Sequence, residues 1–246
     1  MIAHLARGFI LARLDNDQLG ALREYERAVA RAPRDSVAVS FLANQYGTLG
    51  LLQRSADLYR SALVTDPLRA DWYNNLSACL IGLGELDQAT EAIDKAIALQ
   101  PDFPGSRMNL ANIALLRGDA AAARREAGRI NDPDMRATIL AFAAQIDGDA
   151  KAADAALAAY VSKYAEVDPA SVAMLYAQRR QPDKMFEWLQ RARTANAPAL
   201  AANLLNDPQL LRYQGDPRFA ELRRQLRLPS AEALRTVATP LAERTD

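Results

Sequence analysis

The fold of this chain can be read outward from one stretch, DWYNNLSACLIGLGELDQATEAIDKAIALQP, which occupies residues 71–101. Its leucines, small residues, glycine and final proline recur at a constant distance elsewhere in the sequence. Three columns of residues are spaced by 34 positions: Pro33, Pro67 and Pro101; Gly50, Gly84 and Gly118; and Leu42, Leu76 and Leu110. A fixed period of this length, with two helical patterns in each unit, indicates a helical repeat array.

The quoted unit has the residue pattern of a tetratricopeptide repeat. Its first helical pattern contains Tyr73, Leu76, Ser77 and Leu80, and its second contains Ala89, Ile93, Ala96 and Pro101. The chain therefore resembles the tetratricopeptide-repeat family. That family prefers glycine at the position of Ser77 and aromatic residues at those of Leu80 and Ile93, and the replacements remain small or apolar. The resemblance implies an all-α chain, an α-α superhelix of about five to six helix-turn-helix repeats with C-terminal capping helices.

Simple packing arguments support this interpretation. One repeat cannot bury its own apolar face, but a stack of repeats can. Large side chains such as Leu76 would fill the space between helices, and small ones such as Ala89 would let neighbouring helices approach closely. We expect Gly84 to end its helix in the left-handed conformation, where glycine costs least. The proline that closes each unit would stop the second helix from continuing.

Tracing the period in both directions predicts a single solenoid over residues 1–229. The fourth unit has a shortened second helix, and in the sixth Gln181-Pro182 replaces the usual glycine turn. Asp207-Pro208 and Asp216-Pro217 each look like the start of a helix, with aspartate as the cap and proline in the first turn. The predicted repeats are 2–34, 35–68, 69–102, 103–133, 134–167 and 168–197, followed by capping helices over 198–229 and a polar, frayed C-terminal tail over 230–246.

A second resemblance covers nearly the whole chain. The segments ARGFILARLDNDQLGALREYERAVARAPRD (6–35), KMFEWLQRAR (184–193) and DPRFAELRRQLRLP (216–229) are similar to the C-terminal repeat region of bacterial winged-helix transcriptional regulators and repeat-linked adenylate cyclases. In those signalling proteins an effector domain precedes the repeats. The resemblance implies either a stand-alone protein or the regulatory part of a longer one.

Composition argues against several other classes of protein. The 30 basic and 30 acidic residues cancel, whereas a nucleic-acid binder usually carries a basic excess. The apolar run at the N-terminus is broken by Arg7 and Arg13, so a signal peptide is not expected. We therefore expect a cytoplasmic chain without membrane insertion, or a periplasmic one if it belongs to a longer membrane-anchored protein. His4 is the only histidine and Cys79 the only cysteine, and neither suggests a catalytic set, a cofactor or a metal site.

Asparagines on the first helices are the candidate binding residues. Asn75 and Asn109 are 34 positions apart, and in tetratricopeptide-repeat proteins this position faces the concave groove. An amide offers both donors and an acceptor, so a row of amides can bond an extended backbone without reading its side chains. The resemblance thus predicts a peptide-binding groove that contains Asn75 and Asn109, extended by Asn44, Asn74 and Asn112.

Two further residues were assigned to the same groove. Arg107 offers a charge and Met108 an adaptable apolar surface. A basic clamp for a C-terminal carboxylate, which some members of the family possess, would need cations on successive first helices. The middle repeats offer only Arg69 and Arg107, which argues against such a clamp.

The sequence therefore favours a non-enzymatic protein–protein interaction module that binds a peptide or a partner helix in the concave groove. The alternatives are a regulatory domain of a larger transcriptional regulator or adenylate cyclase, and an RNA-binding helical repeat, against which the zero net charge argues. We expect a protein or peptide partner, and self-association is a further outcome to test.

Overall fold

The computed structural model describes residues 1–15, 17–195, 197 and 200–238. Every regular element among them is a helix, which confirms the predicted all-α superhelix. The first twelve helices form six consecutive pairs, and α9 begins at Pro133, one residue before the fifth repeat range expected from the sequence. The pairs are α1 (Ile2–Arg13) and α2 (Gln18–Arg31); α3 (Ser36–Thr48) and α4 (Leu52–Thr65); α5 (Ala70–Leu83) and α6 (Leu86–Leu99); α7 (Pro104–Leu116) and α8 (Ala120–Ala127); α9 (Pro133–Ala144) and α10 (Ala150–Tyr164); α11 (Pro169–Gln178) and α12 (Pro182–Thr194).

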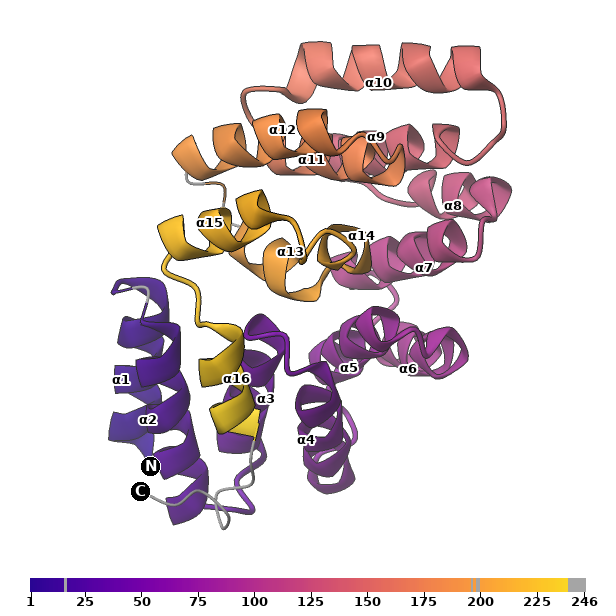
Figure 1. Cartoon of the computed structure of the whole chain (residues 1–246). Helices are drawn as coiled ribbons and strands as arrows, with labels where there is room; N and C mark the ends of the chain where they lie inside the picture. The colour runs from indigo at the N-terminus through magenta and orange to yellow at the C-terminus, as the bar shows by residue number, and fades with distance from the viewer. Residues whose placement is uncertain (16, 196, 198–199, 239–246) are drawn as a thin grey trace.

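The two helices of a repeat occupy different sides of the solenoid. Successive first helices contact one another, from α3 to α5, α7, α9 and α11, and each second helix packs on the first helix of its own repeat. The first helices therefore line the inner, concave face along which the chain curves (Figure 1).

The turns inside the repeats follow the expected glycine column. Gly84 ends α5 with a φ of 79°, and Gly50, Gly118 and Gly148 also have positive φ. The sixth repeat keeps the same turn without a glycine, because Arg180 takes the left-handed conformation with a φ of 55°. Its next residue donates the same backbone bond, from Gln181 N to Tyr176 O at 3.0 Å, that closes the other turns.

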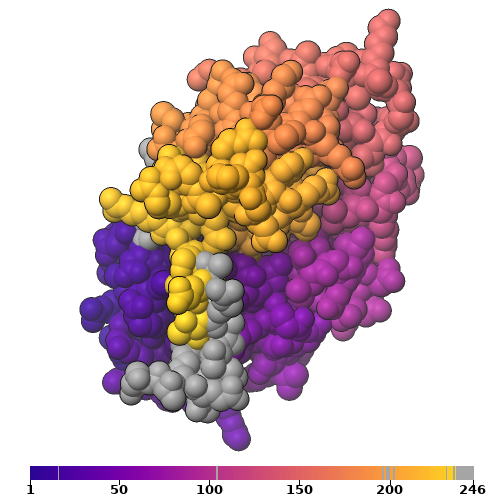
Figure 2. Space-filling model, in the orientation of Figure 1, coloured from indigo at the N-terminus to yellow at the C-terminus, as the bar shows by residue number. Residues whose placement is uncertain are grey.

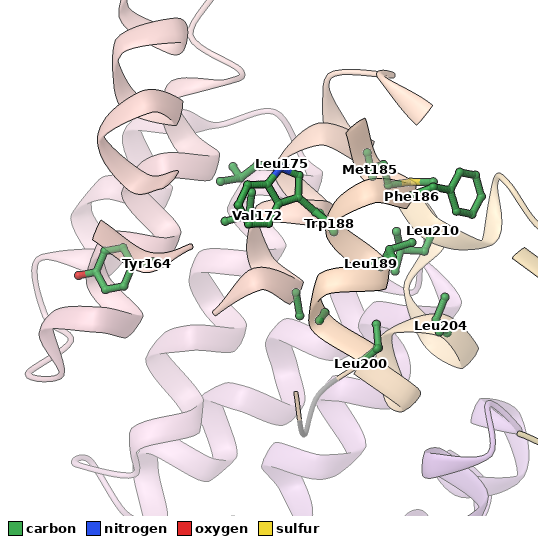
Figure 3. Close-up of a cluster of buried hydrophobic side chains, with 14 of the residues drawn as sticks. Tyr164, Val172, Leu175, Met185, Phe186, Trp188, Leu189, Leu200, Leu204 and Leu210 are labelled. Carbon is green, nitrogen blue, oxygen red and sulfur yellow. The ribbon is translucent and has the colours of Figure 1, made fainter. Parts of the chain in front are cut away.

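The core is a row of clusters, the largest of which lies at the C-terminal end of the solenoid. Trp188 and Leu189 of α12 pack there against Leu175 of α11, and all three are buried. Leucines from beyond the sixth repeat complete this cluster, as Figure 3 shows: Leu200, Leu204 and Leu210 lie against α12. The helices after residue 197 are thus part of the core and not an appendage.

Four short helices follow the solenoid: α13 (Leu200–Asn206), α14 (Pro208–Leu211), α15 (Pro217–Gln225) and α16 (Ala231–Ala238). Asp207 and Asp216 cap α14 and α15, as the sequence predicted. The predicted capping segment, 198–229, does more than cover the last repeat. Helix α13 reaches α3, where Asn206 Nδ2 donates to Gly47 O at 2.9 Å, so this segment links the last repeat to the second.

The segment expected to be a polar, frayed tail, 230–246, is helical over part of its length. Residues 231–238 form α16, which runs beside α3 and the α1–α2 pair (Figure 1). Leu234 packs against the apolar cluster of α2 and α3, and an amphipathic segment gains stability from such burial that a free tail would lack. Residues 239–246 lie outside the described part of the chain.

Candidate functional site

A cleft of about 630 Å³ opens on the concave side of the first three repeats. Its wall comes mainly from the first helices α1, α3 and α5, with two residues from α2 and single contributions from α4 and α13. The lining therefore depends on the stacking of three repeats and not on any one of them. The lining residues are Phe9, Ala12, Arg13, Gln18, Tyr25, Val37, Ser40, Phe41, Asn44, Gln45, Thr48, Tyr59, Arg69, Asp71, Trp72, Asn75 and Ala201.

One side of the cleft is apolar. Phe9 of α1 and Val37 of α3 are 51% and 44% exposed, so both can contribute apolar surface to a ligand. Phe41 lies behind them, with its ring centroid 5.6 Å from that of Tyr25. Gly8 makes room for this arrangement, because a Cβ at that position would lie 2.5 Å from the Tyr25 ring. The apolar side thus has a supported aromatic base and an exposed rim.

The other side of the cleft carries amides grouped around a buried tyrosine. Asn75 Nδ2 donates to Tyr59 Oη at 3.2 Å, and the same hydroxyl is hydrogen-bonded to Asn44. Burial raises the pKa of Tyr59 to about 12, so its hydroxyl stays neutral and keeps both partners. The bond to Tyr59 uses one of the two amide hydrogens of Asn75 and fixes the orientation of its side chain.

A charged pair lies between the two sides. Arg69 donates to Asp71 through Nε at 2.9 Å and Nη2 at 2.7 Å, and its guanidinium lies 4.2 Å from the centroid of the Trp72 ring. The bond to Asp71 raises the pKa of Arg69 further. The charge of a guanidinium that is paired bidentately with one carboxylate is already balanced, so it attracts a second, incoming carboxylate less strongly.

The structure separates the asparagines that the sequence grouped together. Asn44 and Asn75 line the cleft, whereas Asn109 Nδ2 donates to Asn74 O, Asn74 Oδ1 and Ser77 Oγ at 3.2, 3.2 and 2.9 Å. Asn74 also lies against α7, since a Cβ at Gly105 would lie 2.8 Å from its amide nitrogen. Asn74 and Asn109 therefore join α5 to α7, and neither is part of the cleft lining.

The remaining predicted groove residues also lie away from the cleft. Arg107 pairs with Glu126 at 3.1 Å, and Met108 packs against the core of the fourth repeat. Asn112 is partly exposed on α7, outside the cleft. Position in the repeat alone thus does not decide which side chains meet.

Sequence reasoning missed the apolar side of the cleft. The signal was present in the same column as the asparagines, because Phe41 lies 34 positions before Asn75. An aromatic residue in a column otherwise occupied by amides indicates that the second repeat contributes contact area instead of hydrogen bonds.

Two negative findings concern the described residues. They contain no group of three or more His, Cys, Asp or Glu side chains arranged to hold a metal ion. None of their helices combines the length and apolar character needed to cross a membrane.

Comparison with known proteins indicates the class of protein that shares this fold. No protein-family model matches the chain. A segment of 95 residues is 33% identical to the Hsp70-Hsp90 organizing protein of Triticum aestivum, a match that covers 37% of this chain and 16% of that protein. The chain thus corresponds to a small part of the length of that relative.

Solved structures agree on the fold. PilW, a type IV pilus biogenesis factor, has a TM-score of 0.59 at 19% identity over 86% of this chain and 96% of its own. A tetratricopeptide repeat protein from Parabacteroides merdae has a TM-score of 0.57 at 13% identity, over 95% and 94% of the two chains. The chain is a helical solenoid with the fold of tetratricopeptide-repeat proteins.

Proposed function

We propose that this chain is a non-enzymatic interaction module that holds a segment of another protein in the cleft of its first three repeats. The observation that carries the proposal is the composition of the cleft, where exposed Val37 and Phe9 and the amides of Asn44 and Asn75 line one space of about 630 Å³. A concave site that combines apolar side chains with a few oriented polar groups is a usual form of a binding site.

Each side of the cleft would have its own part in binding. The apolar rim would bury aliphatic or aromatic side chains of the partner. Asn44 and Asn75 would bond polar groups of its main chain, because amides both donate and accept. Arg69, held by Asp71 and Trp72, would contribute its flat apolar stem and face. The site thus suits an uncharged, partly apolar segment.

The relatives support a protein partner in general terms. The name of the Triticum aestivum relative describes a protein that organises two chaperones, and this chain matches 16% of its length. The ion pairs of Arg69 with Asp71 and of Arg107 with Glu126 argue against recognition of a C-terminal carboxylate here. The alternative, that the repeats regulate a larger transcriptional regulator or adenylate cyclase, remains a prediction.

Four substitutions test the proposed site. We expect that a protein captured by the wild-type chain from its native lysate, and then identified, is lost with Val37→Asp and weakened with the double variant Asn44→Ala, Asn75→Ala. Val167→Asp is the matched control, because Val167 is 76% exposed and does not line the cleft. All variants must first show wild-type helical circular dichroism.

The outcome separates the cleft from other surfaces. If the identified partner binds the two cleft variants and Val167→Asp with equal affinity in a titration, the cleft is not the binding site. If Val37→Asp alone loses the partner, the apolar rim provides the binding and the amides do not.

A further inference from the structure

The concave surface of the first repeats is already partly covered by the chain itself. Helix α16, shown in yellow, lies between the indigo α1–α2 pair and the purple helices that follow (Figure 2). Leu234 packs against the buried cluster of α2 and α3 that contains Tyr25, and Ala12 and Phe41 pack against the same cluster. Tyr25, Ala12 and Phe41 also line the cleft, so α16 shares its apolar cluster with the candidate site and lies next to it.

The segment just before α16 is fixed to α15, next to this surface. Arg223 Nη2 of α15 donates to Pro229 O at 2.7 Å, and Pro229 is buried. Ser230 Oγ then accepts from Ala233 N at 3.1 Å, which caps the first turn of α16. The anchor is therefore at α15, and the helix begins directly at the point from which it crosses to α3.

The surface beneath α16 holds the helix itself only weakly. Among the described side chains of α16, Leu234 is partly buried and Glu232 and Thr236 are exposed. A helix of eight residues is unstable alone in water. A short tether supplies an effective concentration on the order of millimolar, which favours docking even of a weak ligand.

We propose that α16 is a displaceable occupant of the concave surface, and that the partner is an amphipathic helix with a leucine-type anchor that takes its place. This inference rests on the proposed function and specifies its partner. The partner helix would insert its anchor where Leu234 packs, on the cluster that contains Tyr25, and extend from there into the cleft toward Val37 and Asn44. Helix-in-groove binding uses such apolar anchors at helical spacing.

The test uses the full chain and a labelled peptide of residues 229–246 as the probe. Leu234→Asp should release α16 because it places a charge in the apolar cluster. Thr236→Asp is the matched control, since it adds the same charge on an exposed position of the same helix. Fluorescence anisotropy then measures binding of the peptide to each chain, with the peptide carrying Leu234→Asp as the negative probe.

The expected result is that the peptide binds the Leu234→Asp chain at least about tenfold more tightly than it binds wild type or Thr236→Asp. Equal affinity for all three chains would overturn the proposal. So would failure to bind Leu234→Asp at about 1 mM, because docking in the intact chain requires a dissociation constant below the effective concentration of the tether. Loss of the partner in Val37→Asp alongside either negative result would leave the proposed function standing and remove only the role of α16.

Discussion

The glycine at the turn of the second repeat offers a direct measure of how the C-terminal helices are attached. Gly50, Gly84 and Gly118 occupy the same turn and have φ angles of 79°, 79° and 76°. Among the described residues, no atom beyond the two chain neighbours lies within 4 Å of a Cβ at Gly84 or Gly118, so alanine there costs only backbone strain, about 1–2 kcal/mol. At Gly50 a Cβ would lie 2.7 Å from Leu205 O and 3.1 Å from Asn206 Oδ1.

Alanine at Gly50 should therefore cost more than at Gly84. The first neighbour is main chain and cannot rotate away, so α13 must shift or the site is overpacked, at about 1–3 kcal/mol beyond the strain. A shift would also stretch the bond from Asn206 Nδ2 to Gly47 O, now 2.9 Å, which contributes about 1 kcal/mol. The total expected for Gly50→Ala is about 2–6 kcal/mol.

Urea denaturation followed by circular dichroism gives the free energy of unfolding for each variant. Hydrogen exchange at residues 203–207 reports separately on α13, and we expect faster exchange in Gly50→Ala and no change in Gly84→Ala or Gly118→Ala. If Gly50→Ala and Gly84→Ala destabilise the chain equally, within about 0.5 kcal/mol, then α13 does not dock on the second repeat and the linkage described above is wrong.

Three further predictions follow from single residues. Arg180→Gly should stabilise the chain by about 1 kcal/mol, seen as a higher urea midpoint, because it removes left-handed strain; an unchanged midpoint would show that the turn is unstrained. Burial raises the pKa of the Asp207 carboxyl, so the free energy of unfolding falls as the pH rises from the ordinary aspartate pKa to this raised value. Asp207→Asn should therefore melt at or above the wild-type temperature at pH 7, by a margin that shrinks as the pH falls toward about 4. A margin that stays constant with pH would contradict this. Cys79 is buried and donates to Ser55 Oγ at 3.1 Å, and burial raises the pKa of its thiol; Ellman's reagent should label it only as fast as the fold opens, whereas rapid labelling in buffer would show that α4 and α5 separate easily.

The occupied concave surface changes how an interaction assay should be read. A wild-type chain that captures little from a lysate would be consistent with α16 occupying the apolar cluster beside the cleft. Comparison with Leu234→Asp distinguishes a covered site from an absent one. The same comparison detects exchange of α16 between two copies of the chain. Dimers held together in this way would be dissociated by the 229–246 peptide, and they would form with the wild-type chain but not with Leu234→Asp.

The sequence by itself determined the helices, their turns and the solenoid class. Residues that recur every 34 positions make contacts between neighbouring segments of the chain, such as Gly84 at its turn and Ala89 against the preceding helix, and these contacts recur from repeat to repeat. Because the contacts are local, the sequence of one repeat is enough to predict them. The shortened α8, with 8 residues, was likewise visible as missing sequence.

Only the tertiary structure decided which side chains meet across repeats. Asn75 and Asn109 share one column, yet the first lies in the cleft beside Tyr59 and the second joins α7 to Asn74. Asn206 reaches Gly47 across 159 residues, and α16 returns to the surface of α3. Such contacts depend on the curvature that accumulates over six stacked repeats. Each interface between repeats adds a small rotation, and the sum of these rotations, which no single repeat encodes, brings the two ends of the chain together.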